Sequence, residues 1–134
     1  MITLGTRSAN RLEGVHADLV KVVHRAAEIS GIDFTVLEGI RTLARQNELM
    51  AKGATTTMKS RHLTGHAVDL APMIRGEVRW DWPLYYKLAE IIKRAAADVG
   101  VTIEWGGDWK TFKDGPHWQL PWAAYPSSER PAVR

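Results

Sequence analysis

The sequence contains no cysteine among its 134 residues. This absence excludes disulfides, thiolate metal ligands and cysteine nucleophiles. A transition-metal site would therefore be built from His, Asp and Glu, a donor set that suits zinc with an open coordination position. Long hydrophobic runs are also missing, since no apolar stretch approaches the roughly 18 residues of a membrane span. The N-terminus lacks the apolar core of a secretory signal, so we expect a chain made in the cytoplasm without a signal peptide and not inserted into a membrane.

The length and composition are those of one globular domain. Hydrophobic residues make up 45% and charged residues 25% of the chain, which is ordinary for a folded domain, and 134 residues are too few for two. We expect a single domain over 1–134, monomeric, with a flexible tail from about residue 124. The net charge of +3 and the pI near 9.4 suit anionic surroundings such as a bacterial wall. Because Lys and Arg are scattered, we expect no nucleic-acid partner.

Hydrophobic periodicity and breaker residues predict a mixed fold. Helices are expected over about 12–30, 43–52 and 82–99, and strands over 33–40, 66–72, 101–105 and 117–120, with a hairpin around Gly76. The segments 53–65 and 106–115 are predicted loops. This pattern favours an α+β fold, a small and mostly antiparallel sheet with packed helices and with polar groups at its loop edge.

Asp69 lies in the predicted strand 66–72. Side chains alternate along a strand, so Ala67, Asp69 and Ala71 share one face. The two small neighbours leave space beside the carboxylate. A buried aspartate without a partner would cost several kcal/mol, so a cation, a hydrogen-bond donor or water is expected to fill that space.

Two histidines compete as partners of Asp69. His62 precedes Asp69 by seven residues, so the chain must bend for both to share a face, and Gly65 supplies a bend. His62 and His66 are four residues apart, as in a helical zinc motif, but Thr64 and Gly65 argue against a helix and the glutamate of that motif is absent. We rank His62 above His66 as a ligand.

A third element is "DGPHW", residues 114–118. Asp114 precedes His117 by three residues, and Gly115 and Pro116 impose a turn between them. A carboxylate close to a metal-binding histidine, yet not itself a ligand, is what a zinc hydrolase needs as a general base. Each of these residues alone has an ordinary structural explanation, and the tryptophans around this loop, among them Trp109, either pack structurally or wall a cleft.

Taken together, the motifs resemble those of the zinc peptidase family of D-alanyl-D-alanine carboxypeptidases and L-alanyl-D-glutamate endopeptidases. The stretch "SRHLTGHAVD" (60–69) is similar to the family pattern S-x-H-x-x-x-G-x-A-x-D, and "WGGDWKTFKDGPHW" (105–118) resembles its second motif. Arg41, Thr42 and Gln46 resemble an R-[ST]-x-x-x-Q element. The resemblance covers roughly residues 10–120, and the opening of the chain looks like that of tailed-phage endolysins.

The resemblance implies roles for individual residues. His62, Asp69 and His117 match the zinc ligands, Asp114 the catalytic base and Arg41 a substrate-binding arginine. Ser60 matches a residue that supports the site, Gln46 is a weaker match to a substrate contact, and His66 occupies a variable position.

The activity implied is zinc-dependent hydrolysis of the peptide stem of peptidoglycan, at the L-alanyl-D-glutamate bond. An endolysin of this kind would reach the wall after the membrane is permeabilised. The alternatives are a D-alanyl-D-alanine carboxypeptidase with the same fold, and a non-catalytic wall-binding module that uses zinc structurally.

Overall fold

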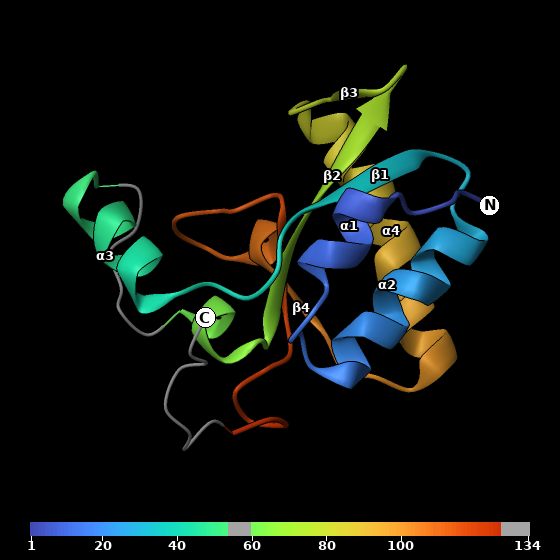
Figure 1. The fold of residues 1–134 in the computed structure, drawn as a ribbon. Coiled ribbons are helices and arrows are strands. Elements are labelled where there is room, and N and C mark those ends of the chain that lie inside the picture. The colour runs from blue at the N-terminus through green and yellow to red at the C-terminus, as the bar shows by residue number, and fades with distance from the viewer. Residues whose placement is uncertain (54–59, 127–134) are drawn as a thin grey trace.

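The computed structural model describes residues 1–53 and 60–126 (Figure 1). These residues form four α-helices and a small antiparallel sheet, as expected for an α+β fold. The helices are α1 (Thr6–Arg11), α2 (Ala17–Ile29), α3 (Leu43–Ala51) and α4 (Trp82–Val99). The strands are β1 (Asp33–Glu38), β2 (Ala67–Ile74), β3 (Glu77–Val78), β4 (Glu104–Trp105) and β5 (His117–Gln119). Two 3₁₀ helices, η1 (Arg61–Thr64) and η2 (Gly106–Asp108), stand next to the strands.

The sheet has the order β1-β2-β5-β4, and β3 pairs with β2 as the second strand of a hairpin. All pairings are antiparallel, and β2 in the centre pairs residue by residue with β5. Helices α2 and α4 pack against each other on one side of the sheet (Figure 1). Val68, Leu70 and Trp118 belong to the hydrophobic core that these helices complete. Asp69 and His117, which alternate with them, therefore project from the other face.

The helix expected over about 12–30 begins later, as α2 at Ala17, and the short helix α1 before it was not predicted. Gly14 adopts a positive φ of 81°, and the chain turns between α1 and α2. His16 caps the second helix, because its Nδ1 accepts a hydrogen bond from the backbone N–H of Asp18 at 3.1 Å. Leu12 and Val15 in this turn are nevertheless buried. Their spacing therefore continues the apolar pattern of the helix, although they lie outside it.

Three further boundaries differ from the expectation. Strand β2 does not end at Pro72 but continues to Ile74. The Pro72 carbonyl points away from β1 and accepts a hydrogen bond from the Arg79 N–H. The Pro72 nitrogen points to the same side as its carbonyl, so its missing hydrogen costs no hydrogen bond to β1. The expected loop 53–65 contains η1, and its residues 54–59 lie outside the described residues. Strand 101–105 shortens to Glu104–Trp105, and the following loop begins with η2.

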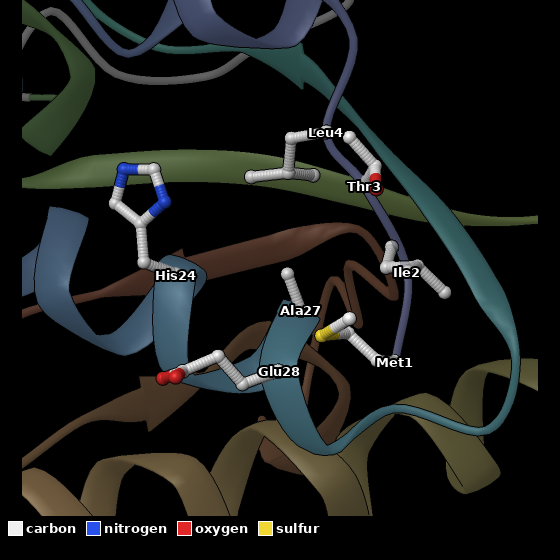
Figure 2. Close-up of a pocket in the computed structure, with 7 residues that line it drawn as sticks. All are labelled: Met1, Ile2, Thr3, Leu4, His24, Ala27 and Glu28. Carbon is white, nitrogen blue, oxygen red and sulfur yellow. The ribbon is translucent and has the colours of Figure 1, made fainter.

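The start and the end of the described chain are both held against the fold. The N–H of Ile2 donates to Ala27 O at 2.9 Å, and a surface pocket opens beside this contact (Figure 2), lined by Met1, Ile2, Thr3, Leu4, His24, Ala27 and Glu28. The pocket contains none of the predicted site residues. At the other end, the Tyr125 hydroxyl donates to Asp18 at 2.6 Å, while the rest of the expected tail, from residue 127, lies outside the described range. Within the described ranges, no helix combines the length and apolar character needed to cross a bilayer.

Candidate metal centre

Three segments far apart in sequence bring His62, Asp69 and His117 together. One ligand atom from each lies within 4.8 Å of the others. His62 comes from η1, Asp69 from the middle of β2, and His117 opens β5. Asp69 and His117 are direct partners in the β2–β5 register, so the sheet itself places them side by side. His66, the competing histidine, does not belong to this group; its Nδ1 lies 2.6 Å from the Thr64 hydroxyl oxygen instead.

A sharp bend at Gly65 returns His62 to Asp69. Gly65 ends η1 with φ of 78°, in the left-handed region that favours glycine. A Cβ at this position would lie 2.6 Å from the Gly14 carbonyl oxygen. Ser60 begins η1 by accepting a hydrogen bond from the His62 N–H at 3.2 Å. Ser60 thus caps the short helix that carries His62.

Hydrogen bonds on the far side of each imidazole determine which nitrogen faces Asp69. His62 Nδ1 lies 2.8 Å from the Gly39 carbonyl oxygen, which only accepts, so Nδ1 carries the hydrogen. The lone pair of His62 Nε2 then points to Asp69 Oδ1 at 3.2 Å. In His117 the roles are reversed: Nε2 lies 2.7 Å from Gln119 Oε1, and Nδ1 faces Asp69 Oδ1 at 3.5 Å. Both rings therefore offer a lone pair to the same point.

These separations fit a tetrahedral zinc ion. Ligand atoms about 2.0–2.1 Å from zinc lie about 3.3 Å apart in a tetrahedron. The distances of 3.2 Å and 3.5 Å from Asp69 Oδ1 to the two nitrogens agree with that spacing. Two neutral imidazoles and one carboxylate, each oriented by its surroundings, form the donor set of a zinc site with an open position.

Without a metal, Asp69 and His117 perturb each other's ionisation. Burial alone would raise the pKa of Asp69, but hydrogen bonds from His117 and His62 in their protonated forms, together with the charges of these forms, hold it well below its usual value. Burial alone would lower the pKa of His117, and the hydrogen bond and charge of Asp69 raise it instead. The site thus attracts positive charge, whether protons or a metal ion.

Asp114 stands next to this group without joining it. Among the described residues, only His62, Asp69 and His117 meet as a potential metal-binding set. Burial, followed by the charge of Asp69, raises the pKa of Asp114, while the charges of His117, His62 and Arg41 lower it. A carboxyl with a raised pKa beside a metal-binding set is a stronger proton acceptor than an ordinary aspartate. Its turn is tight, because the His117 N–H donates to Asp114 O and the Asp114 N–H donates to Gly106 O.

Arg41 follows β1, three residues after Glu38, the last residue of that strand. Its Nε donates to Glu38 Oε1 at 2.8 Å and its Nη1 to Gln46 Oε1 at 2.8 Å, and Nη2 also pairs with Glu38. Ser60 Oγ lies 3.5 Å from Nη1. The Arg41 side chain is only 11% exposed, and these contacts hold its guanidinium in one orientation. Gln46 thus orients Arg41, and its predicted contact with substrate stays a prediction.

The sequence did not predict several of the residues around the centre. Glu38 pairs with Arg41 and stands 3.8 Å from His62 Nδ1. The buried Gln119 and the half-buried Glu104 stand behind His117. Trp109, a predicted site residue, stacks at a tilt on His117 with ring centroids 5.1 Å apart. The position of Gln119 two residues after His117, on the same strand face, is the one signal that could have identified it.

The chain is similar in sequence and structure to bacteriophage and bacterial peptidases. The profile of the family described as phage L-alanyl-D-glutamate peptidase matches residues 1–119. The L-alanyl-D-glutamate peptidase of Escherichia phage T5 is 35% identical over 114 residues, which are 82% of this chain and 83% of that protein. The peptidoglycan L-alanyl-D-glutamate endopeptidase CwlK of Bacillus subtilis (strain 168) is 32% identical, over 78% of this chain and 69% of its own length.

Two solved structures have the same fold. The L-Ala D-Glu endopeptidase ChiX of Serratia marcescens is 49% identical, with a TM-score of 0.87 over 91% of this chain and 92% of that one. A vancomycin-resistance D,D-dipeptidase is similar in fold, with a TM-score of 0.57 at 21% identity, covering 79% of this chain and 50% of its own.

Proposed function

Since the chain belongs to the phage L-alanyl-D-glutamate peptidase family, we propose that His62, Asp69 and His117 hold a catalytic zinc ion with which it cleaves peptidoglycan. It is a peptidoglycan hydrolase, and the bond named by its family and its relatives joins L-alanine to D-glutamate. The observation that carries the proposal is the convergence of two oriented imidazole lone pairs on Asp69 Oδ1.

Each group has a task in the hydrolysis. A zinc ion bound here would supply a Lewis acid for the scissile carbonyl and lower the pKa of a water ligand to about 7. Asp114 accepts a proton from the attacking water and delivers it to the leaving amine, for which its raised pKa is suited. Arg41, oriented by Glu38 and Gln46, donates hydrogen bonds to the negative charge that develops on the substrate.

The setting of the reaction follows from the same family membership. We propose that the protein is an endolysin that reaches the wall of the host once the membrane has been permeabilised. A positively charged protein, with a net charge of +3, suits this anionic polymer. We further propose that it acts as a monomer.

The decisive experiment is mass spectrometry of muropeptides after digestion of purified walls. A cut between L-alanine and D-glutamate is expected, and loss of the terminal D-alanine would indicate a D-alanyl-D-alanine carboxypeptidase instead. Metal content is measured in parallel. His117→Ala should lose both zinc and lysis, whereas Asp114→Asn should keep zinc and lose turnover. A His117→Ala protein that lyses walls at the wild-type rate would rule out the metal centre.

A further inference from the structure

A hydrogen-bonded chain leads from a carboxylate on β4 to the proposed metal ligand His117. The Oε2 atom of Glu104 accepts hydrogen bonds from Gln119 Nε2 at 3.2 Å and from Trp109 Nε1 at 2.9 Å. On its other side, the Gln119 amide oxygen lies 2.7 Å from His117 Nε2. Gln119 is only 6% exposed, so water has little access to its amide.

The sheet register builds this chain. Glu104 and Gln119 are direct partners in the β4–β5 pairing, so their side chains lie on the same face. His117 and Gln119 are two residues apart on β5 and share that face. The short strand β4 thus brings a carboxylate to the far side of a metal-binding imidazole.

The charge of Glu104 determines the direction of every hydrogen bond in the chain. An ionised carboxylate only accepts, so Gln119 must turn its NH₂ group to Glu104 and its carbonyl oxygen to His117. The carbonyl oxygen also only accepts, so His117 Nε2 must carry the hydrogen. The lone pair of His117 is then on Nδ1, which faces Asp69.

We propose that Glu104 is a positioning residue, which acts through Gln119 to hold His117 in the one tautomer that can bind the metal. The inference rests on the proposed metal site and deepens it, but it does not depend on which bond the protein cleaves. Partners of this kind behind a metal-binding histidine contribute about 10–100-fold in metal affinity.

Glu104→Gln tests the proposal with almost no change in shape. The new amide can donate to Gln119, so the Gln119 side chain is free to turn over and present its NH₂ group to His117. We expect a part of the neutral form of His117 to change to the Nδ1–H tautomer in the metal-free protein. Long-range ¹⁵N–¹H correlation spectra of the imidazole would detect this change, and zinc affinity, measured by chelator competition, should fall about 10–100-fold.

Two control variants separate this role from a loss of folding. Glu90→Gln makes the same chemical change at an exposed position of α4, and it should leave the tautomer and the zinc affinity unchanged. Trp109→Phe removes the other hydrogen bond to Glu104 but keeps an aromatic ring near His117, and it should keep the Nε2–H tautomer.

A double variant provides the strictest test. Glu104→Gln combined with Gln119→Glu moves the carboxylate one step closer to His117, where it can accept the Nε2 hydrogen directly. This variant should recover the Nε2–H tautomer and zinc binding, a rescue that a merely structural role of Glu104 does not predict. The proposal is overturned if Glu104→Gln keeps the wild-type tautomer and zinc affinity, or if the double variant binds zinc no better than the single one. A wild-type protein that binds no zinc would refute the proposed metal centre, while the tautomer measurement would still test Glu104.

Discussion

Replacing Gly106 with alanine should displace the turn that carries Asp114 and His117. A Cβ at Gly106 would lie 2.4 Å from the backbone oxygen of Asp114, 3.0 Å from Asp114 Cβ and 3.0 Å from His117 Cβ. The nearest of these atoms belongs to the backbone, so no rotation of a side chain can relieve the contact. The Asp114 N–H also donates to Gly106 O at 3.1 Å, which keeps the two segments together.

The size of the effect follows from the overlap. An ordinary contact between carbon and oxygen needs about 3.4 Å, so the turn must move by about 1 Å. Overpacking of this kind costs about 1–3 kcal/mol in the free energy of unfolding. A displacement of about 1 Å at a catalytic group can cost about 10²-fold in rate. We therefore expect Gly106→Ala to remain folded but to lyse walls about 100-fold more slowly.

The assay compares Gly106→Ala with Gly31→Ala. Nothing lies within 4 Å of a Cβ at Gly31, so this control should have the stability and the lytic activity of the wild type. Thermal unfolding measures stability, and the fall in turbidity of a suspension of purified walls measures activity. Wild-type activity in Gly106→Ala, at unchanged stability, would refute the view that this close approach holds Asp114 and His117 in place.

Three further variants test separate parts of the site. In the metal-free protein, the lowered pKa of Asp69 gives stability that is lost as pH falls below about 4, and the raised pKa of His117 gives stability that is lost as pH rises above about 6.5. The thermal unfolding temperature should therefore be highest between these values, and Asp69→Asn should flatten the profile. Arg41→Lys cannot keep the hydrogen bonds to both Glu38 and Gln46, so kcat should fall about 10²-fold at unchanged zinc affinity, and an unchanged kcat would contradict its role. The Tyr85 hydroxyl is buried and has no hydrogen-bond partner in the described part of the chain, and burial raises its pKa to about 12. Denaturant unfolding should therefore show that Tyr85→Phe leaves the free energy of unfolding unchanged or raises it by up to about 1 kcal/mol. A clear destabilisation would reveal a partner.

The residues that carry the proposed chemistry could be predicted from the sequence, but their supporting contacts could not. The alternation of β2 and the bend at Gly65 depend on local sequence, which is why His62 and Asp69 could be matched before the structure was known. The hydrogen bond from Arg41 to Gln46 was not predicted. Glu104 was missed because its importance depends on the register between β4 and β5, a contact between segments 15 residues apart that no local pattern encodes.

The core and the metal centre are fixed by the same strand pairing. Along β5, His117 and Gln119 face the centre, while Trp118 between them faces the core, paired with Val68 of β2 and stacked on Trp105 at 5.5 Å between ring centroids. A slip of β5 by one residue would expose Trp118 and turn both polar side chains into the core. Burial of this large indole therefore holds His117 opposite Asp69. The precision of the metal centre thus arises on the opposite face of the sheet, and a substitution that loosens Trp118 should weaken metal binding without touching a ligand.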